Sequence, residues 1–503
     1  MKSALLAFVC LLLLTATTIT LGEQKVSDDN IVLLLVRNDP TVSFRIWFKV
    51  GSQNDPAGKE GLAKITAAML VDASTQKNSY EQILDKLFPL AASYSASSSV
   101  EMTVIYGRTH KDNLKDYYPL LIDAILVPAF KQEDLDRIKS QALNYLENTL
   151  RYASDEELGK AVLYNTIFAG TPYGHITAGL IESVKGITLD DVRNFYKQYF
   201  TKENIVIGLG GGYDPGLLEN LNKDLSVLPS GLPGPTAKPS PKSFEGIHVT
   251  LVEKEAASTA ISLGFSINIL RGSKDWYALA IANSWLGEHR NQSSHLFQVI
   301  REERGLNYGD YSYIENFPNG GQLTKPPHNV SRQQQILEIW IRPVPNEARH
   351  FALRAAMREF KHLVDKGMTE NDFALTRNFL KKYVLHYAPT TMERLGYALD
   401  DKFYGINGSH LEIFRNMMDK LTLDDVNAAI KKYLQYGNMQ VAIITKDAPA
   451  LRDALVKDAP SPMTYKSTKP QSLLQEDKEI SVFPLNVKPE DVKIVPVTEL
   501  FVK

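Results

Sequence analysis

Histidine and cysteine often carry metal or nucleophilic chemistry, and their spacing in this chain favours neither. The sequence holds ten histidines and one cysteine. None of the histidines lies three or four positions from another, so no helix can present two neighbouring imidazoles on one face to a metal ion. The cysteine, Cys10, lies inside an apolar N-terminal segment. The rest of the chain therefore offers neither a thiol nucleophile nor a disulfide.

The stretch from Glu60 to Leu70, EGLAKITAAML, has a helical pattern with one cation near its centre. Leu62, Ile65 and Met69 fall at helical spacing, and we expect this apolar stripe to pack into a core. Lys64 carries a positive charge at neutral pH and repels a metal ion unless it is deprotonated. The residues by themselves therefore predict a packed helix without metal chemistry.

The N-terminus, residues 1–22, is typical of a secretory signal peptide. Lys2 gives the positive start, and the apolar run from Ala4 to Leu14 is too short to span a bilayer comfortably. Thr20 and Gly22 are the small residues that cleavage before residue 23 requires. The alternative is an uncleaved anchor helix. An exported chain without cysteines indicates a secreted protein of the bacterial periplasm, with no membrane span after cleavage.

The composition is that of an ordinary globular protein. The chain has 503 residues, of which 44% are hydrophobic and 23% charged, so it is long enough for more than one core. The formal net charge is −2. Nothing in this balance favours nucleic acid or an anionic membrane as a partner.

An internal duplication organises the chain. Residues 187–204, ITLDDVRNFYKQYFTKEN, match residues 421–438, LTLDDVNAAIKKYLQYGN, at a constant spacing of 234. Each copy precedes an apolar run typical of a strand, IVIGLGG or MQVAIIT. Thr188 and Thr422 are plausible helix N-caps, because acidic residues follow in the first turn. Each repeat therefore predicts a capped helix followed by a strand.

A second pair of segments supports two homologous domains. RYASDEEL starts at Arg151 and HYAPTTMERL at His386, at nearly the same spacing. The fold class that follows is α+β, with two homologous αβ domains joined by a Pro-rich linker. The predicted segments after the signal peptide are a first domain over 23–227, a linker over 228–244, a second domain over 245–450, and a tail over 451–503 with the strand-like runs ISVF and VKIVPV.

Three longer motifs occur in an order typical of one family. They are VGSQNDPAGKEGLAKITAAML and TPYGHITAG in the first half and WLGEHRNQSSHLFQVIREERGLNYGDYSY in the second. With the duplication, they make the chain resemble the pitrilysin/insulinase family of zinc peptidases over nearly its whole mature length. The resemblance implies a duplicated processing-peptidase-like fold.

The family's catalytic motif is an inverted zinc signature, H-x-x-E-H, in which two histidines bind Zn²⁺ and the glutamate is the general base. By this resemblance Lys64 and Ala68 stand where the histidines would be, and Ala67 stands where the base would be. Glu147 matches the later glutamate ligand. The resemblance thus implies a degenerate zinc site with no metal, no cofactor and no catalytic residue in this chain. We expect Lys64 to pair with Glu147.

The second half keeps a motif that the family uses for substrate. The run LFQVIREERGLNY ends at Tyr308, and the resemblance implies that Arg301 and Tyr308 bind substrate near the scissile carbonyl. The alternative is that Arg301 pairs with a nearby acid and Tyr308 packs under the next strand. In the first half Ser95 replaces an asparagine of the strand edge to which substrate adds as an extra strand.

The resemblance implies the non-catalytic, Arg/Tyr-bearing subunit of a two-chain peptidase that binds unstructured peptides. Its heterodimer partner would be a zinc-bearing family member. A second hypothesis is a structural or peptide-binding pseudoenzyme without such a partner. The third is an active zinc endopeptidase with an unusual site.

Overall fold

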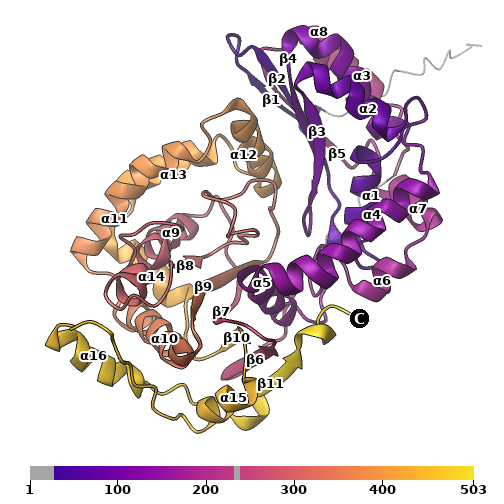
Figure 1. Ribbon diagram of the computed structural model, residues 1–503. Coiled ribbons are helices and arrows are strands. Elements are labelled where there is room, and N and C mark those ends of the chain that lie inside the picture. Colours follow the sequence, from indigo (N-terminus) through magenta and orange to yellow (C-terminus); the bar gives the residue numbers. More distant parts are fainter. Residues whose placement is uncertain (1–27, 232–237) are drawn as a thin grey trace, which may run out of the picture.

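The computed structural model describes residues 28–231 and 238–503. The predicted signal peptide therefore lies outside the described residues, as do residues 232–237 of the predicted linker. Figure 1 shows two halves, each built of a sheet flanked by helices. Within the described ranges, no helix combines the length and the apolar character needed to cross a membrane.

The two sheets repeat one topology. The first has the order β1-β5-β2-β4-β3, and the second has the order β11-β6-β10-β7-β9-β8. In each, the first strand of the half pairs parallel with the strand that follows the repeated helix, and the next strand pairs antiparallel with it. The strands are β1 (Ile31–Leu35), β2 (Thr41–Phe48), β3 (Ser93–Ser98), β4 (Thr103–His110), β5 (Ile205–Gly211), β6 (Ile247–Glu253), β7 (Ser258–Ile267), β8 (Asp310–Tyr313), β9 (Gln335–Pro345), β10 (Met439–Thr445) and β11 (Val492–Pro496).

The helices form an outer layer in each half. In the first half α1 packs on the sheet between α4 and α7, and in the second half α9 packs near α11, α13 and α14. The helices of the first half are α1 (Leu62–Val71), α2 (Tyr80–Leu87), α3 (Leu114–Leu126), α4 (Gln132–Asn144), α5 (Asp155–Ile167), α6 (Ile181–Gly186), α7 (Leu189–Tyr199) and α8 (Pro215–Leu225). Those of the second half are α9 (Lys274–Gly287), α10 (Arg349–Lys366), α11 (Glu370–Tyr383), α12 (Thr391–Tyr404), α13 (His410–Lys420), α14 (Leu423–Tyr433), α15 (Ala448–Val456) and α16 (Gln471–Ser481).

The local predictions for the repeated helices are confirmed. Thr188 caps α7 and Thr422 caps α14, each in a capping box with the aspartate three residues later. The next strands are β5 and β10, as the duplication predicted. The apolar stripe of α1 is also buried, with Leu62, Ile65 and Met69 at most 2% exposed. Local spacing was sufficient here, because caps and apolar stripes depend on neighbours in sequence.

The two halves exchange one helix each, and we call α5 and α12 the crossing helices. Helix α5 belongs to the first half but packs on β7 and β10 of the second sheet. Helix α12 belongs to the second half but packs on β1, β2 and β5 of the first sheet (Figure 1). Their N-caps, Ser154 and Thr390, lie inside the second pair of matched segments. Each sheet is thus covered on one face by the other half, so neither half buries its own sheet alone.

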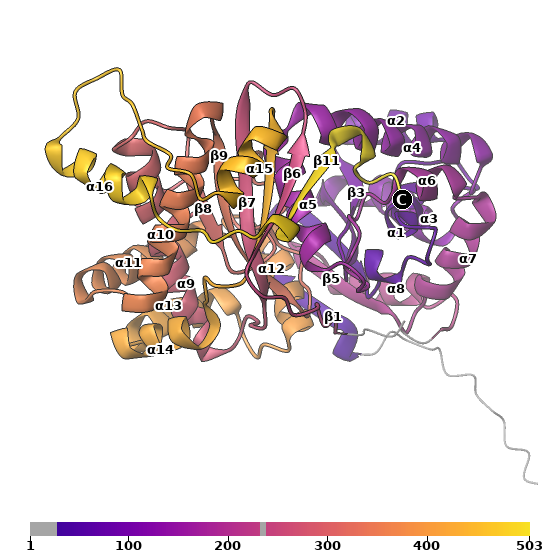
Figure 2. The same ribbon diagram turned by 90° about the horizontal axis from the view of Figure 1, so that it is seen from below.

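The predicted tail, residues 451–503, contains α16 and β11. The run VKIVPV forms β11 and extends the second sheet, but ISVF lies at the end of α16, because Leu473 and Ile480 face the core at helical spacing. Beyond β11, the N–H of Ile181 donates to the carbonyl of Phe501 at 2.9 Å. Figure 2 shows this C-terminal segment running from the second half onto the first.

Candidate functional site

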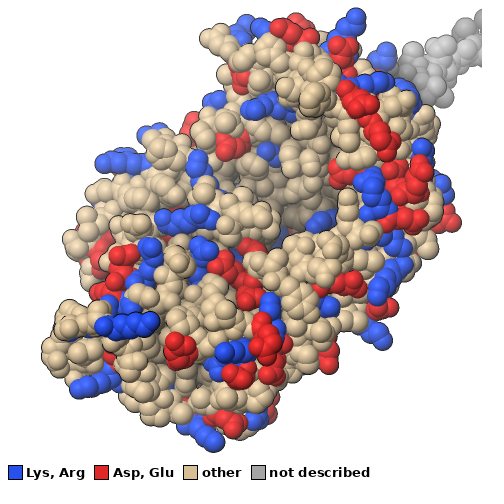
Figure 3. All heavy atoms as spheres, in the orientation of Figure 1, with Lys and Arg blue, Asp and Glu red and all other residues tan. Residues whose placement is uncertain are grey.

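A cavity of about 370 Å³ lies between the halves. Its wall on one side is the edge strand β3, the turn that follows it, and Lys64 of α1. The remaining wall comes from α5, the π-helical segment Tyr145–Ala153, the first-half loop 168–178, and two loop segments of the second half, 316–319 and 330–332. In the space-filling view the molecule is hollowed between its halves, and most of the visible wall is uncharged (Figure 3).

Strand β3 gives the cavity an unpaired sheet edge. It is the last strand of its sheet and pairs only with β4 in the described part of the chain. Ala96 to Ser98 of this strand line the cavity. An edge strand presents a row of free N–H and C=O groups, which an extended peptide can satisfy by adding as a further strand. The site therefore has the main-chain donors and acceptors for a peptide, with Ser95 in the same strand.

The start of α1 is fixed by a buried carboxylate. Asp55 accepts hydrogen bonds from the N–H groups of Gly61 and Ala63, both at 2.7 Å, and His175 contacts it at 3.1 Å. Burial raises the pKa of Asp55, and its contacts with His175 oppose that shift. The first and second family motifs thus meet in space, and they hold the helix that carries Lys64.

Lys64 projects into the cavity from α1. Its side chain reaches solvent there, although protein surrounds it on most sides, and this desolvation lowers its pKa. Its ammonium lies 5.3 Å from the centre of the Tyr145 ring. Ala67 is buried and Ala68 is half-buried on the same helix. With a cation and two methyl groups at the positions of the ligands and the base, the residues present do not fit a zinc ion.

The predicted ion pair between Lys64 and Glu147 is wrong. Glu147 instead lies 3.8 Å from the ammonium of Lys185, and 41% of its side chain is exposed. Tyr145 faces Lys64, and residues two apart on a helix point to opposite sides. Within residues 28–231 and 238–503, no group of three or more His, Cys, Asp or Glu side chains is arranged to hold a metal ion.

Arg301 and Tyr308 do not line the cavity of their own chain. Arg301 lies on the π-helical turn Phe297–Glu302, where it pairs with Glu302 at 3.0 Å and covers the ring of Phe297 at 4.6 Å. Tyr308 is 76% exposed, so it does not pack under β8 as the alternative supposed. The structure therefore separates this pair from the Lys64 cavity.

The sequence analysis missed Arg332, a buried cation in the cavity wall. Arg332 is 2% exposed, and its guanidinium lies 5.1–5.7 Å from the ring centres of Tyr164, Phe168 and Tyr173. Its Nε donates to Gln335, but its Nη2 has no hydrogen-bond partner. No motif marks Arg332, because its aromatic neighbours are far from it in sequence: Tyr164 lies on crossing helix α5, and Phe168 and Tyr173 follow that helix.

A buried ion pair joins the halves behind the cavity. Lys160 of α5 contacts Glu338 of β9 at 3.0 Å, and both side chains are at most 3% exposed. The hydroxyl of Tyr164 donates to the same carboxylate at 3.1 Å. Burial is the largest cause that raises the pKa of Glu338, and Lys160 opposes it. This pair holds α5 against the second sheet.

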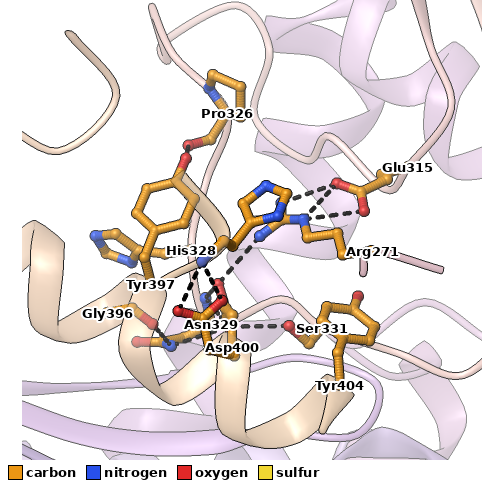
Figure 4. A network of polar contacts seen from close by, with 12 residues as sticks. Arg271, Glu315, Pro326, His328, Asn329, Ser331, Gly396, Tyr397, Asp400 and Tyr404 are labelled. Carbon is orange, nitrogen blue, oxygen red and sulfur yellow. Dashed lines mark hydrogen bonds and ion pairs between the residues drawn. The ribbon is translucent and has the colours of Figure 1, made fainter. Parts of the chain in front are cut away.

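A polar network fixes the loop that leads to Arg332 (Figure 4). Asp400 of α12 accepts from the N–H of Asn329 and the hydroxyl of Ser331, both at 2.9 Å. Arg271 lies 3.5 Å from Asp400 and 2.8 Å from Glu315. From the first sheet, Arg45 donates to the side-chain oxygen of Asn329 at 2.6 Å. Both halves therefore position this loop.

Family models match both halves of the chain. The model described as Insulinase (Peptidase family M16) matches residues 31–179, and the model described as Peptidase M16 inactive domain matches residues 186–380. An uncharacterized zinc protease of Streptomyces coelicolor is 22% identical over 341 residues, covering 66% of this chain and 69% of the relative. The non-peptidase homolog YmxG of Helicobacter pylori is 24% identical over 444 residues, covering 84% and 94%.

Solved structures show the same fold. A peptidase M16 inactive domain from Pseudomonas fluorescens superposes with a TM-score of 0.73 at 22% identity, covering 83% of this chain and 95% of that one. A protease from Helicobacter pylori gives a TM-score of 0.67 at 16% identity, covering 82% and 96%. The chain thus belongs to the insulinase family (peptidase family M16).

Proposed function

We propose that this chain is a non-catalytic, peptide-binding member of the family that acts beside a zinc-bearing relative. The observation that carries the proposal is the division between its two sites. The cavity offers the free edge of β3 but has Lys64 where a metal ligand would be. Arg301 and the 76% exposed Tyr308 lie outside that cavity. Their position outside the cavity of their own chain supports a role toward a second chain.

Reconstitution with a zinc-bearing relative tests the subunit proposal. The chain alone should hydrolyse no unstructured peptide, and the pair should be active. Arg301→Ala should lower the activity of the pair about tenfold or more, because a donor to developing oxyanion charge is lost. Arg193→Ala is the matched control, since Arg193 is a surface arginine paired with Asp190 on α7. Unchanged activity of the Arg301→Ala pair would sink the proposal.

A peptide-binding pseudoenzyme without a partner is the second candidate. The cavity and its edge strand belong to one chain, which favours binding by the chain alone. Pull-down from a native extract separates the two proposals, because only the first expects a zinc-bearing relative to be recovered in stoichiometric amount. Metal analysis addresses the third hypothesis: we expect no bound zinc, and zinc in a one-to-one ratio with hydrolysis by the chain alone would overturn both proposals.

Secretion to the periplasm is also part of the proposal. It is supported by the charged, apolar and small-residue pattern of residues 1–22. Sequencing of the mature N-terminus from a periplasmic fraction should give Glu23 as the first residue. A chain that keeps Met1 and sediments with membranes would support the anchor alternative.

A further inference from the structure

We propose that the cavity selects peptides that carry a carboxylate, which the ammonium of Lys64 binds. This inference rests on the proposed peptide binding and adds the chemical class of the ligand. The carboxylate is an Asp or Glu side chain or the C-terminus of the peptide. Both sources offer the same acceptor oxygens, so the experiment below distinguishes them.

Lys64 is a cation without an anionic partner. It forms no ion pair within the described residues, and its expected partner, Glu147, pairs with Lys185. The contact with Tyr145 uses the ring face, which attracts a cation weakly and accepts no strong hydrogen bond. An ammonium has three donors. Donors of Lys64 therefore remain free toward the cavity.

Arg332 lines the same cavity, and the buried carboxylate of Glu101 interacts with its charge. Its guanidinium is 2% exposed, forms no ion pair within residues 28–231 and 238–503, and leaves Nη2 without a hydrogen-bond partner. The rings of Tyr164, Phe168 and Tyr173 lie around it, and the side chain is almost completely shielded from water. A buried charge in such a setting acts over a longer range than one in water.

The other charged groups of the wall are already satisfied. Lys160 is neutralised by Glu338. Glu157, a carboxylate in the wall, accepts hydrogen bonds from the N–H groups of Asn319 at 3.2 Å and Gly321 at 3.1 Å. Lys64 is thus the cation of the wall that keeps free donors and has no carboxylate beside it among the described residues, whereas the buried carboxylate of Glu101 opposes the charge of Arg332.

The ammonium of Lys64 lies in the same cavity as the free edge of β3. Lys64 lies on α1, which packs directly against β3. An extended peptide along the free edge of β3 presents alternate side chains toward the cavity. A carboxylate on one of them would accept a charge-assisted hydrogen bond from Lys64. Its negative charge would also stabilise the protonated form of Lys64, which desolvation disfavours.

The test measures binding of short unstructured peptides to the purified chain by fluorescence anisotropy. Three peptides share one sequence: the first has a central Glu and an amidated C-terminus, the second a central Gln and an amidated C-terminus, and the third a central Gln and a free C-terminal carboxylate. We expect the first or the third to bind about tenfold or more tightly than the second. The first result identifies a side-chain carboxylate and the third a terminal one.

Variants of Lys64 connect the preference to this residue. Lys64→Met should bring all three peptides to within about twofold of one another while the neutral peptide binds as before, and Lys64→Arg should keep the preference. Lys197→Met is the control, because Lys197 is an exposed lysine on α7. The inference fails, with the proposed function intact, if the three peptides bind equally or if Lys64→Met keeps the preference. If no peptide binds, both fail.

Discussion

The two crossing helices, α5 and α12, both pack closely on a sheet of the other half, but the small residue at the contact lies on the helix in one case and on the strand in the other. Where α5 meets the second sheet, the helix has the small residue: a Cβ on Gly159 would lie 3.6 Å from Cγ1 of Ile444. Where α12 meets the first sheet, the strand has the small residue: a Cβ on Gly210 would lie 3.4 Å from Cδ2 of Leu395. Gly210 and Ile444 match in the duplication at the spacing of 234, and Gly159 and Leu395 each lie five residues after the N-cap of their helix.

This comparison shows what the two halves share after duplication. The topology and the exchange of helices are common to both halves. The large side chain lies on the strand at the α5 contact and on the helix at the α12 contact. Close packing fixes the sum of the two volumes at each contact and leaves their division free. The polar anchors also differ: α5 has the ion pair between Lys160 and Glu338, whereas α12 has the network around Asp400.

The largest effect is expected when the buried ion pair between Lys160 of α5 and Glu338 is broken. Lys160→Met leaves the carboxylate of Glu338 buried without its cation, and we expect the free energy of unfolding to fall by about 3–5 kcal/mol. Replacing both partners by Met and Leu should restore much of that loss, since no unpaired charge remains. Denaturant titration measures both variants. A loss below about 1 kcal/mol in Lys160→Met would contradict the role assigned to the pair.

The next prediction concerns two substitutions that exchange the large and the small side chain at the contact between α12 and β5. Leu395→Ala removes a fully buried side chain and should cost about 2–5 kcal/mol. Gly210→Ile crowds the same space and should cost about 1–3 kcal/mol. In the double variant the new strand residue fills the cavity left on the helix, so its cost should be below the sum of the two by about 1 kcal/mol. Additive costs would show that the two positions do not share one space.

The third prediction concerns pH and distinguishes α12 from α5. Burial raises the pKa of Asp401 on α12 to about 7, from an ordinary value of 3.8. The folded chain therefore holds a proton that the unfolded chain releases near pH 4. The stabilisation from this proton is full below that pH and is lost as the pH rises through about 7.

Asp401→Asn should remove this dependence on pH. Relative to the unsubstituted chain, the variant should gain roughly 1–3 kcal/mol of stability between about pH 5 and about pH 8. Chemical denaturation across that range measures the difference. A difference that stays constant with pH would mean that Asp401 is ionised throughout in the folded chain.

The smallest effect is a gain in stability. Gly159→Ala places a Cβ at ordinary contact distance from its neighbours, 3.5 Å or more, and alanine favours the helix, so the chain should gain about 0.5–1 kcal/mol. Gly208→Ala on the first sheet should be destabilising instead, because its Cβ would lie 2.8 Å from the carbonyl oxygen of Arg45. Thermal melts of the two alanine variants should therefore shift in opposite directions.

Local features of the fold and of the candidate site could be predicted from the sequence. The caps at Thr188 and Thr422 and the buried stripe of α1 depend on residues close together in the chain. The same holds for the loss of the metal ligands, since Lys64 and Ala68 are read directly from one helix. The pairing of Lys64 with Glu147 was wrong, because the orientation of a side chain on a distant helix is set by packing.

What the sequence by itself determined is the duplication, the family and the absence of the zinc motif, because each is a matter of residue order and spacing. Only the tertiary structure decided which half covers which sheet, where the C-terminal segment binds, and that Lys64 and Arg332 line one cavity. These depend on contacts between residues hundreds of positions apart, such as Arg45 with Asn329 and Lys160 with Glu338. Such contacts form where volumes and charges match in three dimensions, and no local pattern records them.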